Sequence, residues 1–149
     1  MDDQMLDEFR HDFALLIEAG FVAVKQLDET SAKRLFQAAQ LLRPESSAPE
    51  IGIGFIALNK LEVKDATAIF QAVIEREPDN YLAKTFLGIC YLLVKAKRPE
   101  GEKLIEEART QSTDSTVKNL CDVSLEWAEK DLKKGSKAPF FSKPVKEST

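Results

Sequence analysis

Apolar and small residues return along this chain with a period of 34 positions. Gly20, Gly54 and Gly88 occupy the same place in successive periods. The residues after each glycine also match by offset: Ala32, Phe36, Ala39 and Pro44 in the first copy, Ala66, Phe70, Val73 and Pro78 in the second, and Gly101, Ile105 and Ala108 in the third, after a one-residue insertion between 95 and 99. Copies that stay in phase over this length predict a protein built from tandem units.

A unit of 34 residues has the length of a tetratricopeptide (TPR) repeat, which is a helix–turn–helix hairpin. Small residues lie where the two helices cross, and a proline ends the second helix because it disfavours helix in the preceding residue. We therefore predict an all-α fold, a TPR superhelix with repeats at 13–46, 47–80 and 81–114. The pattern is incomplete, since Ala23 and Ala57 occupy the places where it has tyrosine and only Tyr91 keeps it.

The segments around the repeats complete the predicted domain, which spans 1–134. Residues 1–12 form an acidic lead-in that merges into the first helix, and Ser47 to Glu50 resemble a capping box. Asp79 or Asn80 is expected to cap the helix that begins at Tyr81, and Ser115 is expected to cap a last, capping helix over 115–134. One apolar stripe predicts that last helix: Val117, Leu120, Cys121, Leu125, Ala128 and Leu132. Residues 135–149 are expected to be a disordered basic tail.

The charge of the chain is unevenly distributed. The net charge is −4, but residues 133–149 contain five lysines and one glutamate, so the remainder carries −8. An acidic body repels phosphates, which argues against a nucleic-acid partner. The longest apolar runs are too short for a membrane helix, and the N-terminus lacks the pattern of a signal peptide. We therefore expect a cytoplasmic protein without membrane insertion.

The inner face of the predicted superhelix is apolar. Inward positions lie at −6, −3, +1, +4 and +5 from each glycine, on one face of the first helix of each repeat. Ten of these residues form the predicted groove: Ile17, Phe21, Val24, Ile51, Phe55, Leu58, Leu82, Thr85, Ile89 and Leu92. A contiguous apolar surface usually marks a binding site, and an amphipathic helix is the natural ligand for such a groove. A charge at Phe55, in its centre, is expected to abolish binding.

Two other occupants of the predicted groove remain open. The chain could fill it with its own ends, either the N-terminal Met5, Leu6 and Phe9 or the tail residues Phe140 and Phe141. A homodimer could also cover it.

Chemistry that would mark an enzyme is missing from the sequence. His11 is the only histidine, and the separated Cys90 and Cys121 fit no common zinc spacing. Both cysteines are expected to be buried thiols. The chain also lacks a glycine-rich phosphate loop and a nucleophile paired with a base. We therefore expect a binding protein that is not an enzyme and needs no cofactor or metal.

In its size, its acidic charge and its predicted apolar inner face, this chain resembles the TPR chaperones of bacterial type III secretion systems. The resemblance covers roughly 13–134, with repeat residues Gly20, Ala32, Phe36, Gly54, Ala66, Phe70 and Gly88 and groove residues Ile17, Phe21, Ile51, Phe55, Ile89 and Leu92. The chain looks more like the needle-subunit (G-type) branch than the translocator-chaperone branch, whose members are expected to begin with a long dimerisation helix.

The resemblance implies a specific function and partners. The groove would hold an amphipathic helix of the needle subunit in the cytoplasm and prevent premature polymerisation, and a small co-chaperone would be a second partner. The alternatives are a chaperone of hydrophobic translocators and a structural TPR adaptor in a larger assembly.

Overall fold

The computed structural model describes residues 3–130 and 132, and within them every regular element is helical. The elements are α1 (Asp3–Lys25), α2 (Glu29–Leu42), α3 (Ala48–Asn59), α4 (Val63–Arg76), α5 (Tyr81–Leu92), the short 3-10 helix η1 (Lys95–Lys97), α6 (Arg98–Gln111) and α7 (Ser115–Lys130). The all-α prediction is confirmed. The predicted tail at 135–149 lies outside the described residues.

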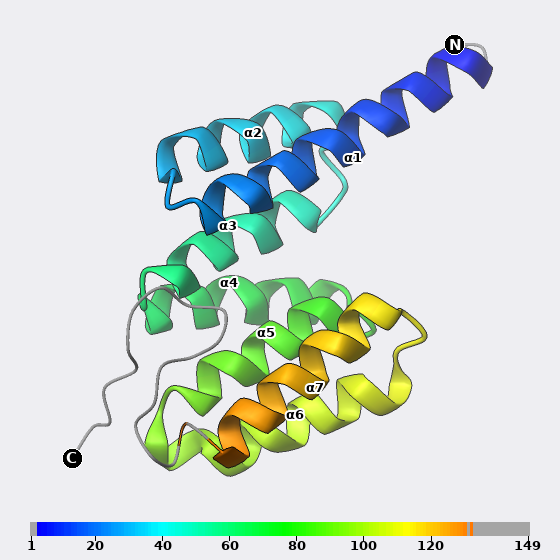
Figure 1. Ribbon diagram of the computed structural model, residues 1–149. Coiled ribbons are helices and arrows are strands. Elements are labelled where there is room, and N and C mark those ends of the chain that lie inside the picture. Colours follow the sequence, from blue (N-terminus) through cyan, green and yellow to red (C-terminus); the bar gives the residue numbers. More distant parts are fainter. Residues whose placement is uncertain (1–2, 131, 133–149) are drawn as a thin grey trace.

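Each helix packs on its neighbour in sequence, and the odd-numbered helices form a row of their own. The pairs α1/α2, α3/α4 and α5/α6 contact each other closely, and α7 packs on both α5 and α6 (Figure 1). In addition, α1 contacts α3, α3 contacts α5, and α5 contacts α7. In the described part of the chain, no Cα atoms of α2, α4 and α6 come within 8 Å of one another. The odd-numbered helices therefore form one layer, and each even-numbered helix packs against this layer, separated from the other even-numbered helices.

Glycine sets the distance between α5 and α6. A Cβ atom added to Gly101 would lie 2.6 Å from the backbone oxygen of Gly88 and 3.0 Å from the backbone nitrogen of Leu92. Backbone atoms cannot rotate away as a side chain can, so any larger residue must move the two helices apart.

Gly101→Ala tests this crossing. Alanine normally stabilises a helix relative to glycine by about 0.5–1 kcal/mol. Overpacking costs typically about 1–3 kcal/mol, so we expect a net loss in the free energy of unfolding, measured by urea denaturation. Glu106→Ala, an exposed change on the same helix, is the control and should shift stability by less than about 0.5 kcal/mol. A Gly101→Ala variant as stable as the parent would show that glycine does not set this distance.

The helix caps correct two of the sequence predictions. Asn80 caps α5, because its side chain accepts a hydrogen bond from the backbone N–H of Ala83 at 3.0 Å. Asp114 caps α7 by accepting from the N–H of Thr116 at 2.8 Å, whereas Ser115 was predicted. The predicted capping box at Ser47 is also wrong, since Ser47 makes no capping hydrogen bond. Its hydroxyl instead donates to Glu77 at 3.1 Å, which ties the start of α3 to the end of α4.

The turns within the helix pairs follow the 34-residue period only twice. Leu27 and Leu61 occupy the same place in the α1–α2 and α3–α4 turns, and both adopt the left-handed backbone conformation, with φ of 63° and 60°. The third turn contains the inserted residue and forms η1 instead. There the Arg98 Nε donates to the backbone oxygen of Leu92 at 3.1 Å and covers the end of α5.

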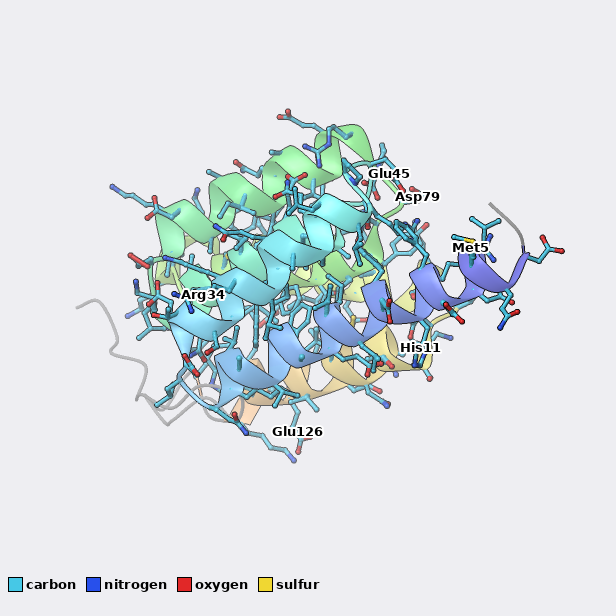
Figure 2. All side chains as sticks on the ribbon, turned by 90° about the horizontal axis from the view of Figure 1, so that it is seen from above. Met5, His11, Arg34, Glu45, Asp79 and Glu126 are labelled. Carbon is cyan, nitrogen blue, oxygen red and sulfur yellow. The ribbon has the colours of Figure 1, made fainter. Side chains whose placement is uncertain are left out.

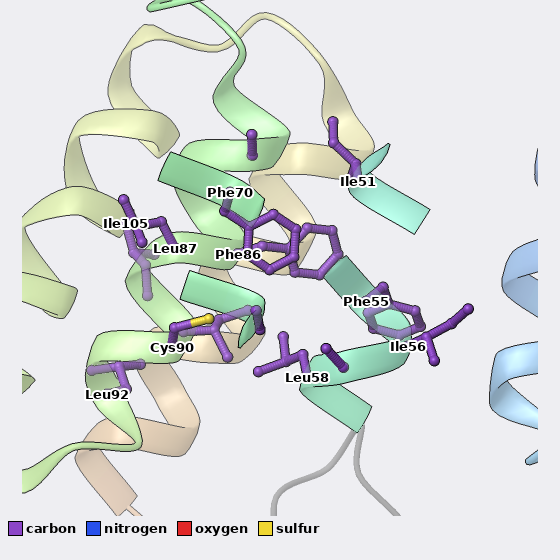
Figure 3. Packing of buried hydrophobic residues seen from close by; sticks show 14 of the residues in the cluster. Ile51, Phe55, Ile56, Leu58, Phe70, Phe86, Leu87, Cys90, Leu92 and Ile105 are labelled. Carbon is purple, nitrogen blue, oxygen red and sulfur yellow. The ribbon is translucent and has the colours of Figure 1, made fainter. Parts of the chain in front are cut away.

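A continuous apolar core runs through α1 to α7 and includes a series of aromatic rings. The ring of Phe21 lies 5.3 Å from that of Phe36 and 5.4 Å from that of Phe55, centre to centre. Phe55 in turn lies 5.4 Å from Phe86, which stacks on Phe70 at 5.3 Å (Figure 3). These ring contacts link α1 through α5 in one chain, so the helix pairs are not independent of each other.

Candidate functional site

The structure buries most of the predicted groove residues. Ile17, Phe21 and Leu82 are half-buried. The other seven are buried in the core: Val24, Ile51, Phe55, Leu58, Thr85, Ile89 and Leu92. A buried side chain adds little contact area to a ligand that approaches from outside, so the reachable anchors are fewer than the sequence predicts.

Contacts between odd-numbered helices explain this burial. Phe55 on α3 is 6% exposed because its ring is enclosed between Phe21 and Phe86. On α5, the Thr85 hydroxyl lies 3.3 Å from the Cys121 sulfur of α7 and also donates to the backbone oxygen of Tyr81 at 2.7 Å. The inward positions therefore pack on the next odd-numbered helix. The sequence did contain one sign that α7 packs against α5, because the predicted apolar stripe of α7 includes the small residues Cys121 and Ala128.

A smaller apolar surface remains, which we name the inner-face patch and define by Ala14, Ile17, Phe21, Ala48 and Leu82. Ala14 is exposed and the other four are half-buried. They come from α1, α3 and α5, which contact each other in that order. Ala14, Ala48 and Leu82 also share one offset in the 34-residue period.

A hollow adjoins this patch at the start of α5. Leu82 and Val117 supply apolar wall to a cavity of about 310 Å³, and Asp79, Gln111 and Asp114 supply polar wall. Its residues belong to the beginnings of α5 and α7 and the turns before them. The volume and mixed lining suit one amphipathic or apolar side chain from a ligand.

The N-terminal residues do not fold back over the patch. Met5, Leu6 and Phe9 belong to α1 itself, and Met5 is 54% exposed. The first turns of α1 extend beyond the end of α2 in Figure 1, and Figure 2 places Met5 and His11 along this extension. Self-filling by these three residues is therefore excluded in this conformation. The other predicted occupants, Phe140 and Phe141, lie outside the described residues.

Both thiols are buried. Burial raises the pKa of Cys90 to about 12, an effect only partly offset by a hydrogen bond with Thr67. Burial also raises the pKa of Cys121, against the opposing hydrogen bond with Thr85. Each thiol is therefore protonated at neutral pH, and a protonated thiol is a poor nucleophile and a poor metal ligand.

The described residues hold no cluster of three or more histidine, cysteine or acidic side chains able to bind a metal ion. Within 3–130, none of the helices combines the length and the apolar character needed to cross a bilayer.

A second hollow, of about 660 Å³, lies between α2 and α4, with Phe36, Ile53 and Ile69 among its apolar walls.

Comparisons with protein-family models, with curated proteins and with solved structures found no match to this chain.

Proposed function

We propose that this chain is a TPR-type chaperone whose inner-face patch holds an amphipathic helix of a type III secretion needle subunit in the cytoplasm. The observation that carries the proposal is the inner-face patch itself. Ile17, Phe21 and Leu82 keep part of their apolar surface accessible on helices that contact in series. A guest helix crossing α1, α3 and α5 would cover all three.

The binding energy available at this patch is moderate. Fully burying an isoleucine, leucine or phenylalanine is worth about 1.5–3 kcal/mol, and these three are already half-buried. The hollow beside Leu82 offers one further anchoring point. After the cost of ordering the guest, an affinity in the micromolar range is expected.

Such binding would act on polymerisation. A subunit that assembles through an apolar helical face cannot do so while that face is covered. An affinity in the micromolar range also allows release, because the complex dissociates quickly enough for the export machinery to take up the subunit.

The double variant Ile17→Asp/Leu82→Asp tests the site. Two carboxylates in the patch would have to lose water when a guest helix covers them, so we expect the affinity for the needle subunit to fall at least about a hundredfold. Isothermal titration calorimetry with the needle subunit of the same genome measures this. Leu41→Asp, at a residue of α2 that is 83% exposed, is the matched control and should bind as the parent does. Unchanged affinity in a folded double variant would rule out the inner-face patch.

One observation favours a second candidate, the translocator-chaperone branch. α1 has 23 residues whereas α3 and α5 have 12 each, and its start extends past α2. A long first helix is the feature expected of that branch. A stable homodimer in analytical ultracentrifugation, abolished by removing residues 1–9, would favour the translocator chaperone over the needle-subunit chaperone.

A further inference from the structure

A third hollow, of about 300 Å³, lies away from the inner-face patch. It is formed by the first half of α4 and by the end of α5 with the turn into α6. Lys64 of α4, Tyr91 of α5 and Lys97 of η1 all belong to its lining. We name it the Lys64–Lys97 pocket. It occurs where the third helix pair departs from the 34-residue period, because Lys97 lies in the turn with the inserted residue.

Contacts among its own side chains organise the wall of this pocket. The Gln71 amide donates to the Tyr91 hydroxyl at 3.0 Å. The Lys97 ammonium lies 5.2 Å from the centre of the Tyr91 ring, and the Lys97 backbone N–H donates to the oxygen of Val94 at 2.8 Å. Tyr91, the one tyrosine that the repeat pattern retains, therefore fixes both sides of the pocket.

The polar groups of the pocket are mostly donors. Lys64 and Lys97 have no carboxylate within ion-pair distance among the described residues. The Tyr91 hydroxyl accepts from Gln71, so its own hydrogen remains available to donate. The acidic residues near these lysines in sequence, Glu62, Asp65 and Glu100, are absent from the lining. Glu62 pairs with Lys60 at 3.2 Å.

We propose that the Lys64–Lys97 pocket binds an acidic segment of a partner protein, with a carboxylate between the two ammonium groups and the Tyr91 hydroxyl. Hydrogen bonds from charged donors to a carboxylate are the stronger kind, and they need this excess of donors. Val63 and Val94 add apolar wall, which suits an aliphatic residue beside the carboxylate. Charges beyond about 10 Å are screened at physiological salt, so the acidic body does not cancel this local attraction. The proposal does not depend on the proposed function, because none of these residues belongs to the inner-face patch.

The test uses the full chain and a short fluorescent peptide of glutamates and leucines, with its lysine-for-glutamate counterpart as comparison. We expect anisotropy to show binding of the acidic peptide only, weakened by added sodium chloride. Lys64→Gln/Lys97→Gln should lower the affinity about tenfold. Tyr91→Phe removes the hydroxyl and keeps the aromatic ring, and it should lower the affinity about threefold. Lys103→Gln/Lys118→Gln makes the same change of net charge at exposed lysines outside the pocket and should leave binding unchanged.

These measurements distinguish binding at the Lys64–Lys97 pocket from nonspecific electrostatic attraction of the peptide to the protein. Equal losses in the two double variants, or equal binding of the two peptides, would overturn the proposal. Binding of inorganic phosphate without binding of the acidic peptide would also overturn it, because the pocket would then take a free anion. Circular dichroism of each variant ensures that a loss of binding is not a loss of fold.

Discussion

Phe55→Asp is expected to unfold the protein. Loss of a buried phenylalanine costs about 3–5 kcal/mol, and an unpaired carboxylate in its place adds a desolvation penalty. The sum is of the same order as the whole stability of a small domain, about 5–15 kcal/mol. Phe55 is 6% exposed and lies between Phe21 and Phe86, so a carboxylate at this position would lose most of its contact with water. Circular dichroism at 222 nm measures the result.

The sequence predicts a different outcome for this variant, namely a folded protein that no longer binds its partner. Phe55→Leu is the matched control, because it keeps an apolar side chain and should remain folded with a lowered melting temperature. A Phe55→Asp variant with the helix content and cooperative melting of the parent would contradict the burial of this residue.

Phe36→Ala is expected to lower the free energy of unfolding by about 3–5 kcal/mol. The Phe36 ring fills the space left by two glycines on different helices. A Cβ on Gly20 would lie 2.5 Å from the ring, and a Cβ on Gly52 would lie 2.4 Å from it. Because neither glycine has a side chain that can move into the vacated volume, the cavity should persist and the cost should fall in the upper part of that range.

Urea denaturation of Phe36→Ala measures this loss. Leu41→Ala, an exposed change on the same helix, should shift stability by less than about 0.5 kcal/mol. If the two variants lost similar amounts, Phe36 would not be the residue that joins α1, α2 and α3.

The helices were predictable because two signals agreed. The glycine and alanine positions of the 34-residue period mark close helix approaches, and Gly88 with Gly101 shows such an approach in the structure. Residues that break helices, such as Pro44 and Pro78, lie just beyond the ends of α2 and α4. The one-residue insertion was also visible in the sequence, but its conformation as η1 was not, since a shift in period does not specify backbone angles.

The binding surface was less predictable. Periodicity places a residue on a face of a helix, but it does not say whether another helix covers that face. Thr85 shows the difference, because its offset points inward and the structure covers it with Cys121 of α7. Caps were similarly ambiguous, because Asp114 and Ser115 are both good capping residues and only the backbone geometry selects between them.

Photo-cross-linking can show whether the guest helix lies on the inner-face patch. A benzophenone amino acid at position 14, which is exposed in the inner-face patch, is irradiated with the needle subunit present, and the same group at Leu41 serves as comparison. We expect a covalent adduct to an apolar-face residue of the needle-subunit helix from position 14 and none from position 41. An adduct from position 41 alone, or from neither position while the two proteins remain bound, would contradict binding at the inner-face patch.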